Sequence, residues 1–483
     1  MKREISVYGG IKKTLCLRGA QVNKPDARLT SLLAFPSLML SLPFFGVCLD
    51  MKILVIGGGG REHALVSAIR KSPCVTQVVC APGNGGIASV ARCVPVNQKD
   101  LTDLLRVVEA EQPDLTIVGP ELPLSLGLVD AMQQRKLRVF GPTQRAAQLE
   151  SSKAFAKEFM QRHQIPTARY SVCRSAAELT EALVHFRAPI VVKADGLAAG
   201  KGVVICESKE EAFASATQMF DGELLGTAET CVVLEEFLEG EETSFLVLAD
   251  GLHTLPLVAA QDHKRIGDGD TGLNTGGMGA YSTDTLIDAA MRDWLLAHVA
   301  QPVLDGMAAE GAPFTGVLYC GMMMTARGPM VLEFNARFGD PETQAVLPRL
   351  QSDLVHAIEA AIDGKLDQIS LTWNPQPSVC VVAASGGYPG DFENGKIITG
   401  LADAAAVEGV EVYHSGTALK DGNEGTLVTA GGRVLVVTAL ADTVQAACDR
   451  AYSALGKIHF DGIYYRRDIA HRALQKKDGA KKI

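Results

Sequence analysis

Several familiar sequence patterns are absent from this chain of 483 residues. Its eleven cysteines include no C-x-x-C pair, and without regular spacing they indicate neither a zinc site nor a disulfide framework. Its 48 glycines follow no G-X-Y period, which excludes a collagen-like fibre. Internal repeats and low-complexity segments are missing as well. We therefore expect a globular protein with reduced, mostly buried thiols, located in the cytoplasm.

Positively charged residues are also fewer than negatively charged ones. The chain has 46 Lys and Arg against 55 Asp and Glu, which leaves a net charge of −9. Nucleic-acid-binding surfaces carry a basic excess, so no nucleic-acid partner is expected. Hydrophobic residues make up 47% and charged residues 21%, which is typical of globular proteins and excludes disorder throughout.

Residues 1–50 differ from the rest of the chain. Residues 29–49 contain no charged side chain, which is typical of a signal peptide or a membrane anchor, although Pro36 and Pro43 disfavour an anchor. The segment MKILVIG, beginning at Met51, has the pattern of a first buried strand that needs nothing upstream. We therefore expect residues 1–50 to be a disordered extension or a mis-called start. No other apolar run is long enough to span a bilayer, so no membrane partner is expected.

The pattern of residues 51–150 predicts a Rossmann-like domain with a parallel sheet. Short apolar runs alternate with helical stretches, as in βαβ units. The runs lie at residues 52–57, 77–81, 115–119 and 139–141. Glycine and proline cluster after each run, at the sheet edge where open α/β sheets bind ligands.

The rest of the chain mixes strand and helix patterns, so the predicted fold class is α/β, or α+β overall. We expect a central domain at 151–345. A linker helix region is predicted at 346–374 and a small mixed β/α domain at 375–475. The polar, proline-flanked stretch 371–376 indicates the last boundary.

Two glycine-rich loops indicate anion binding. Gly57–Gly60 follows the first strand and opens a helix, an arrangement that favours a phosphate. Glu62 stands where the dinucleotide fingerprint needs its third glycine, so an NAD site is not indicated. The second loop, Gly196–Gly202, has the wrong spacing for a Walker A motif and joins two strands. With Lys193 and Lys201 nearby, it suits a flexible cover over a polyphosphate.

Carboxylates and amides at strand ends indicate a metal site. Glu333 and Asn335 alternate along a strand and therefore point the same way. Hard oxygen ligands of this kind suit Mg²⁺ together with substrate phosphates. Arg337, two residues on, can grip a phosphate or a carboxylate. The long polar stretch 268–281 is expected to be a functional loop, whereas His263 is expected to be packed, since no second histidine lies at ligand spacing.

The motifs together resemble those of the phosphoribosylamine–glycine ligase (glycinamide ribonucleotide synthetase) family of the ATP-grasp superfamily. They occur in order from Met51 to about Ala473. They are GGGGREHA at 57–64, PGN at 82–84, GPE at 119–121, SKAF at 152–155, KADGLAAGKG at 193–202, NTGGMGAY at 274–281 and EFNARFGDPETQ at 333–344. The resemblance implies an N-terminal phosphoribosylamine-binding domain and an ATP-grasp domain whose lid is the subdomain at about 170–240.

The resemblance also implies site residues. ATP is expected at Lys153, Lys193, Gly200, Lys201, Glu235, Phe237, Leu238 and Glu242, with Glu241 as the alternative ribose acid. The phosphoribosylamine is expected at Gly58, Gly59, Gly60, Asn84 and Glu121. The metal, Mg²⁺ or Mn²⁺, is expected at Glu333 and Asn335. Glycine and acyl-phosphate chemistry is expected at Arg337, Asp262 and Lys264.

The activity implied is the ATP-dependent joining of glycine and 5-phosphoribosylamine in de novo purine biosynthesis, through a glycyl phosphate. Such chemistry requires positioning and charge neutralisation more than a protein nucleophile. The alternative is another ATP-grasp carboxylate–amine ligase or a carboxylase. A monomer is expected, with a dimer as the alternative.

Overall fold

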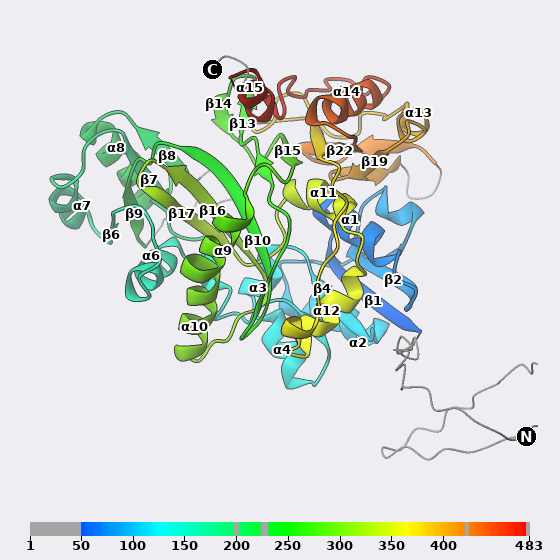
Figure 1. Cartoon of the computed structure of the whole chain (residues 1–483), viewed down its shortest axis with the longest axis horizontal. Helices are drawn as coiled ribbons and strands as arrows, with labels where there is room; N and C mark the ends of the chain where they lie inside the picture. The colour runs from blue at the N-terminus through cyan, green and yellow to red at the C-terminus, as the bar shows by residue number, and fades with distance from the viewer. Residues whose placement is uncertain (1–49, 198–201, 224–229, 421–424, 480–483) are drawn as a thin grey trace, which may run out of the picture. The chain divides into compact units, whose positions relative to one another are not determined.

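The computed structural model describes residues 50–197, 202–223, 230–420 and 425–479, with side chains to residue 475. The predicted extension therefore lies outside the described residues except for Asp50, and so do the predicted ATP-binding residues Gly200 and Lys201. The described chain mixes helices with parallel and antiparallel sheets, which confirms the predicted α/β class (Figure 1).

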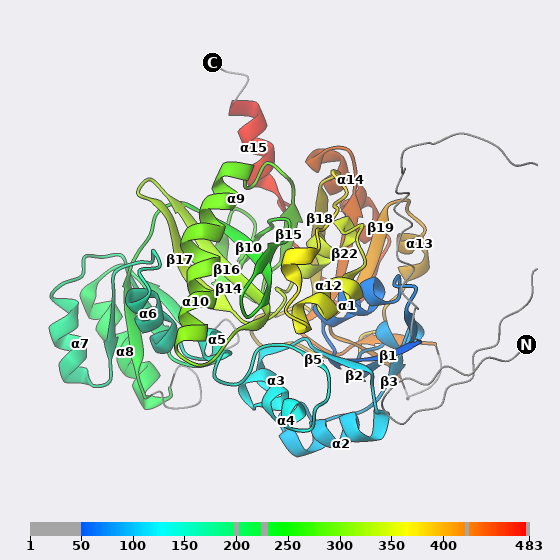
Figure 2. The ribbon, with the colours of Figure 1, turned by 60° about the horizontal axis from the view of Figure 1, so that its bottom comes forward.

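The N-terminal region forms a parallel five-stranded sheet of order β3-β2-β1-β4-β5. Its strands are β1 (Met51–Gly57), β2 (Val75–Pro82), β3 (Arg92–Cys93), β4 (Leu115–Val118) and β5 (Val139–Phe140). Its helices are α1 (Gly60–Ile69), α2 (Leu101–Glu111), α3 (Glu121–Ser125) and α4 (Leu128–Gln134). Figure 2 shows α2, α3 and α4 together on one side of the sheet. The apolar side chains of β1 point alternately to both faces, and both are buried, as parallel sheets require.

A small antiparallel sheet of order β6-β9-β7-β8 follows two helices. The helices are α5 (Gln148–Ser151) and α6 (Lys153–Arg162), and the side chain of Ser152 caps α6 by accepting from the amide of Phe155. The strands are β6 (Tyr170–Cys173), β7 (Ile190–Ala194), β8 (Val203–Cys206) and β9 (Val232–Glu236). Helices α7 (Ala176–Leu183) and α8 (Lys209–Asp221) share its apolar core.

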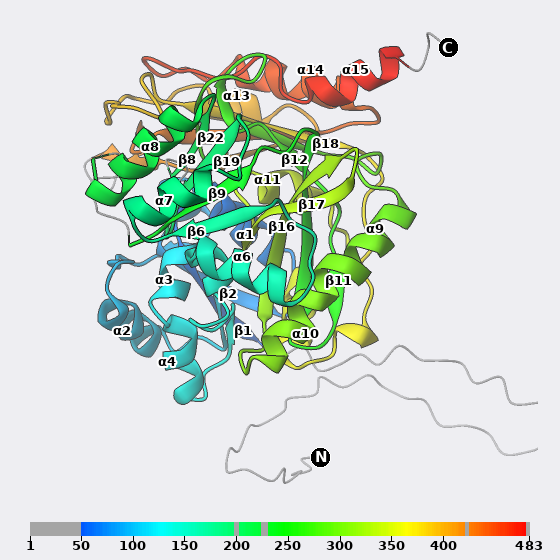
Figure 3. The same ribbon diagram turned by 90° about the vertical axis from the view of Figure 1, so that its left-hand side faces the viewer.

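A second antiparallel sheet has the order β11-β10-β16-β17. Its strands are β10 (Glu241–Asp250), β11 (Thr254–Pro256), β16 (Thr315–Thr325) and β17 (Gly328–Asn335). Helices α9 (Ala289–Leu295) and α10 (Gln301–Ala309), joined by a π-helical turn (Leu296–Ala300), run beside it (Figure 3). Buried apolar side chains of these helices and of β10 and β16 belong to one core.

The C-terminal sheet, of order β12-β15-β18-β22-β19, takes strands from two distant parts of the sequence. Strand β15 (Gly279–Ser282) pairs with β12 (Gln261–Asp262) on one side and with β18 (Ser378–Ala384) on the other. Strand β22 (Arg433–Leu440) then lies between β18 and the edge strand β19 (Val410–His414). Two hairpins are formed by β13 (Arg265–Gly267) with β14 (Thr271–Asn274) and by β20 (Thr417–Leu419) with β21 (Leu427–Thr429). The remaining helices are α11 (Glu342–Val346), α12 (Leu354–Ile362), α13 (Leu401–Ala405), α14 (Val444–Leu455) and α15 (His471–Gly479).

The prediction of a loop at 268–281 was therefore wrong in part. About half of this stretch lies in β14 and β15. Their glycines and polar residues show no strand periodicity, and β15 is held by pairing with Val379 and Val381, about a hundred residues later. By contrast His263 is packed as predicted, since its Nε2 accepts a hydrogen bond from the amide of Ala470.

Three buried histidines tie the stability of the fold to pH. Burial lowers the pKa of His63 to about 3 and that of His414 to about 4, and His414 adds to the effect on His63. Burial, reinforced by Arg466 and Arg472, lowers the pKa of His263 to about 3. At these three histidines the unfolded chain therefore binds more protons than the native protein below pH 6.5, so their contribution to stability falls with pH in that range.

We expect the free energy of unfolding to decrease as the pH is lowered from 6.5 to 5. Each histidine contributes up to about 1.4 kcal/mol per pH unit, a slope that is approached as its unfolded imidazole becomes fully protonated. Urea unfolding at several pH values measures how the free energy of unfolding changes with pH. His263→Gln should reduce this slope by the contribution of one histidine. The exposed His298 provides the control, because His298→Gln should leave the slope unchanged. Equal stability at pH 7 and pH 5 would contradict this account.

Candidate active site

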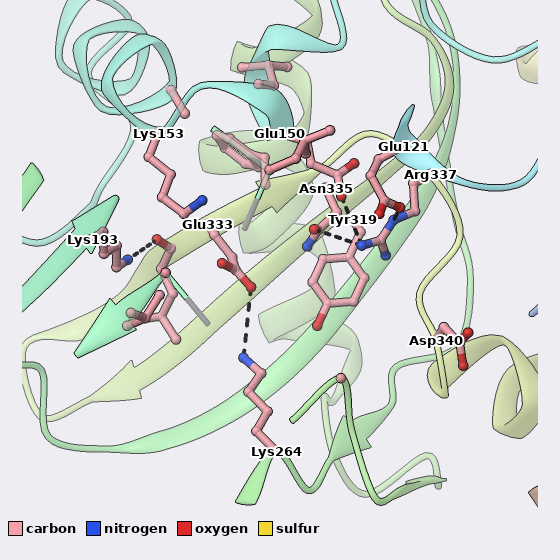
Figure 4. A pocket seen from close by; sticks show the side chains of 18 of the residues that line it. Glu121, Glu150, Lys153, Lys193, Lys264, Tyr319, Glu333, Asn335, Arg337 and Asp340 are labelled. Carbon is pink, nitrogen blue, oxygen red and sulfur yellow. Dashed lines mark hydrogen bonds and ion pairs between the residues drawn. The ribbon is translucent and has the colours of Figure 1, made fainter. Parts of the chain in front are cut away.

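A pocket of about 480 Å³ lies between the two antiparallel sheets and extends to the N- and C-terminal regions. Side chains of α6, β7, β9 and β17 line one part, and residues near β12, α3 and β22 line the rest (Figure 4). Among the predicted site residues, those that line the pocket are Glu121, Lys153, Lys193, Glu235, Asp262, Lys264, Glu333, Asn335 and Arg337. The pocket lining does not include Gly58, Gly59, Gly60, Asn84, Phe237, Leu238 or Glu242.

A buried carboxylate holds two lysines at one end of the pocket. Glu235 on β9 pairs with Lys193 on β7 and Lys157 on α6, each ammonium 2.8 Å from a carboxylate oxygen. Burial alone would raise the pKa of Glu235, but the two lysines outweigh it and hold the pKa below its usual value. Burial lowers the pKa of Lys157 to about 8, although Glu235 opposes the shift. The cluster therefore keeps a net positive charge at neutral pH, as a phosphate site requires.

Lys153 adds a third cation. It lies four residues before Lys157 on α6, so both project from one side of the helix. Its Nζ donates to the carbonyl oxygen of Gly196, at the start of the second glycine loop, over 2.9 Å. The nearby apolar side chains of Leu149, Met160 and Leu332 line the pocket and offer a surface for a nucleobase. Of the predicted adenine residues, Leu238 is buried beside Met323, and Phe237 is partly exposed.

Glu333 and Asn335 on β17 both face the pocket. Burial opposes ionisation of Glu333, but Lys264, Lys193 and Lys153 together hold its pKa below its usual value. The described residues contain no group of three or more His, Cys, Asp or Glu able to hold a metal. One carboxylate and one amide oxygen fit Mg²⁺, because this ion takes its remaining ligands from water and substrate phosphates.

Arg337 links Asn335, a predicted metal ligand, to acidic residues of the N-terminal region and of α5. Its guanidinium lies 2.9 Å from Glu150 and 3.3 Å from Glu121, and it donates to the side-chain oxygen of Asn335 over 3.2 Å. Burial would raise the pKa of Glu121, but Arg337 and Arg61 outweigh it and bring the pKa to about 2. Glu121 is therefore ionised and held in place at neutral pH.

A second acid–lysine group lies on and after β12. Lys264 donates to Glu242 over 2.7 Å and lies 4.0 Å from Glu333. The predicted ribose acid Glu242 is thus paired with a predicted catalytic residue. Burial raises the pKa of Asp262 to about 7; Lys264 opposes the shift, whereas Glu342 and other acids reinforce it. Asp262 can therefore exchange a proton near neutral pH.

The first glycine loop is held by its own helix. The amide of Gly59 donates to Glu62 over 2.6 Å, so this N–H is already occupied. Asn84 donates to the carbonyl oxygens of Gly58 and His414. Gly57 has a positive φ of 125°, and a Cβ there or at Gly119 would collide with the Glu62 side chain. The loop is shaped around Glu62 and lies beside the pocket without lining it.

Sequence reasoning missed several polar residues of the pocket. Lys157 could have been found, because it shares a helix face with Lys153 at a spacing of four residues. The others have no local signal, since their partners come from distant segments: Glu150, Tyr319, Tyr388 and Arg433. Tyr319, for example, donates to Glu342 over 2.9 Å within a buried group that includes Ser244.

Comparison with known families identifies the class first. A family model described as the phosphoribosylglycinamide synthetase ATP-grasp (A) domain matches residues 151–343, so this is an ATP-grasp protein. Models for the N domain and the C domain of the same enzyme match residues 51–150 and 378–472.

Whole-chain comparisons agree. The chain is 50% identical over 434 residues to a phosphoribosylamine–glycine ligase of Pseudomonas aeruginosa, covering 89% of this chain and 100% of that one. The phosphoribosylamine–glycine ligase of Thermotoga maritima, for which a crystal structure exists, is 35% identical in sequence, and its structure superposes with a TM-score of 0.77. The match covers 87% of this chain and 100% of that one. This chain belongs to the phosphoribosylamine–glycine ligase family.

A biotin carboxylase of Campylobacter jejuni shares the fold. It is 14% identical, with a TM-score of 0.66, and the match covers 86% of this chain and 93% of that one. Across the described part of the chain, no helix is long and apolar enough to cross a membrane.

The Glu235 cluster generates a stability prediction. Glu235→Gln removes the only charge that compensates two buried lysines within this cluster, and we expect it to cost about 3–5 kcal/mol of unfolding free energy. Urea unfolding at pH 7 measures the loss. The matched control is Glu236→Gln, the next residue on β9, which pairs with Arg327 at the surface and should cost about 1 kcal/mol or less. Similar losses for both variants would contradict the account.

Proposed function

We propose that this protein is the ATP-dependent ligase that joins 5-phosphoribosylamine and glycine into glycinamide ribonucleotide, with release of ADP and phosphate, in de novo purine biosynthesis. The observation that carries the proposal is the pocket itself. The pocket brings together a lysine cluster, two side chains with oxygen atoms suited to a metal, and the Glu121–Arg337 pair. The chain that forms it matches phosphoribosylamine–glycine ligases over their whole length. The alternative of another ATP-grasp ligase or a carboxylase has less support, because carboxylases match at under 20% identity.

The chemistry has two steps. A glycine carboxylate oxygen attacks the γ-phosphorus of ATP, ADP leaves, and glycyl phosphate forms. The amine of phosphoribosylamine then attacks the acyl carbon, phosphate leaves, and the nitrogen loses a proton. Positioning and neutralisation of charge supply most of the rate in phosphoryl transfer.

The pocket residues divide these tasks. Lys153 and Lys193 neutralise the ATP phosphates, and Lys157 holds Glu235, the partner of Lys193. When bound at Glu333 and Asn335, Mg²⁺ (or Mn²⁺) supplies further charge neutralisation at the phosphoryl group. Arg337 and Lys264 stabilise the acyl phosphate, and Asp262 accepts the proton that the amine releases.

The remaining assignments belong to the same proposal. The domain at 51–150 binds the phosphoribosylamine and brings Glu121 to the pocket, and the domain at 151–345 binds ATP under the lid at about 170–240. The lid excludes water, which would otherwise hydrolyse the acyl phosphate. The enzyme acts in the cytoplasm as a monomer, with a dimer as the alternative.

A coupled assay of ADP release tests the activity directly. The mixture contains the purified protein, Mg-ATP, glycine and phosphoribosylamine generated in place. We expect ADP only when both glycine and the phosphoribosylamine are present, because the amine must consume the acyl phosphate for turnover to continue. ADP release that is independent of either substrate would redirect the search to another acid or amine.

The metal assignment has its own test. Glu333→Gln keeps the size of the side chain but removes a charged ligand, so we expect kcat to fall roughly 10²–10³-fold. Excess Mg²⁺ or Mn²⁺ should recover part of the loss. Glu310→Gln, which alters an acid paired with Arg162 outside the pocket, is the control and should retain normal turnover. Unchanged turnover in the Glu333 variant would overturn the assignment.

A further inference from the structure

One wall of the pocket is supplied by the C-terminal sheet. Arg433, the first residue of β22, lines the pocket although it follows Glu333 by a hundred residues. Its Nη1 donates to the carbonyl oxygens of Gly276 and Asp340, over 2.5 and 2.9 Å. Its Nη2 lies 3.2 Å from the Asp340 carboxylate. One guanidinium thus joins three segments that are far apart in the sequence.

The first of these segments is the loop at 275–277. A Cβ built on Gly276 would lie 3.1 Å from Cζ of Arg433, so the loop rests directly on the guanidinium. The hydroxyl of Tyr388 accepts from the amide of Gly276 over 3.1 Å. Thr275 in turn donates to the carbonyl oxygen of Lys264 from both its amide and its hydroxyl, each over 2.8 Å. The position of the Lys264 backbone therefore depends on this loop.

The second segment is the turn that carries Asp340. The carboxylate accepts from Gln344 over 2.8 Å on one oxygen and faces Arg433 with the other. That second oxygen lies 3.5 Å from the position of a Cβ built on Gly59, so it borders the first glycine loop. Figure 4 shows Asp340 at the end of the pocket opposite Lys153 and Lys193. Arg433 therefore fixes a charged group at the end of the pocket away from the lysine cluster.

We propose that Arg433 is a positioning residue for the phosphoribosyl end of the pocket, acting through Asp340 and the loop at 275–277. The inference rests on the proposed function for the identity of the ligand. Without the guanidinium, the Asp340 carboxylate loses its cation, and the carbonyl oxygens of Gly276, Gly277 and Asp340 lose their donor. Both changes loosen the wall beside Gly59, whereas Lys153, Lys193 and Glu235 keep their hydrogen-bond and ion-pair partners. The consequence is selective loss of phosphoribosyl binding.

The test uses two variants. Arg433→Met keeps the unbranched apolar stem of the side chain without the guanidinium, and Arg433→Lys keeps the positive charge without the planar, forked set of donors. Titration calorimetry on the full chain measures the dissociation constants of glycinamide ribonucleotide, the stable product, and of Mg-ATP. For Arg433→Met we expect the constant for the ribonucleotide to rise at least tenfold and that for Mg-ATP to stay within twofold. The dissociation constant of the ribonucleotide for Arg433→Lys should lie between those for wild type and Arg433→Met.

The matched control is Arg450→Met. Arg450 lies on α14 in the same region and donates to the carbonyl oxygen of Leu440, away from this pocket. It should lower the thermal midpoint without changing either dissociation constant. If Arg433 served only to stabilise the fold, its variant would behave like this control, and the proposal would be overturned. A rise in both constants for Arg433→Met would also overturn it.

A double-mutant cycle tests the route through Asp340. In an Asp340→Asn background, Arg433→Met should weaken ribonucleotide binding much less than in wild type, because the pair is already broken. An undiminished effect would show that Arg433 acts without Asp340. Failure of the proposed function is distinguishable, since wild-type protein would then bind no glycinamide ribonucleotide and show no substrate-dependent ADP release.

Discussion

The pocket depends on one constraint, that every charge withdrawn from water needs a partner or a ligand. Its lining carries many ionised groups, and the structure pairs them across segments. Glu235 holds two lysines, Arg337 holds two carboxylates, and Arg433 holds Asp340. Because these pairs join different helices, strands and turns, the charge balance of the pocket depends on how the elements around it pack.

This constraint explains why the C-terminal region belongs to the site. Its sheet incorporates β12 and β15, which flank the segment that carries Lys264 and the loop at 275–277. Strand β22 then brings Arg433 to the edge of the pocket. The C-terminal region has no predicted site residue, yet its backbone pairing and the guanidinium of Arg433 hold neighbouring segments of the pocket in place.

Much of the fold could be predicted because its signals are local. The apolar runs at 52–57 and 115–119 match β1 and β4 closely, since buried parallel strands need continuous apolar side chains. Strands β12 to β15 could not be predicted, because short polar strands have no periodicity and exist only through their partners. The site followed the same division. Lys193, Glu333 and Arg337 stand in motifs and line the pocket, whereas Tyr319 and Arg433 stand in no motif and were missed.

The sequence by itself determined the class of protein and the chemical groups of the pocket, because the motifs with lysines, acids and glycines lie in short contiguous segments. Only the tertiary structure decided how those groups are neutralised. It showed that Glu62 occupies the Gly59 amide, that Glu235 is committed to two lysines, and that Asp340 is held by the C-terminal sheet. Pairing of buried charges acts through distances of a few ångströms in space, and such distances between remote residues are set by packing.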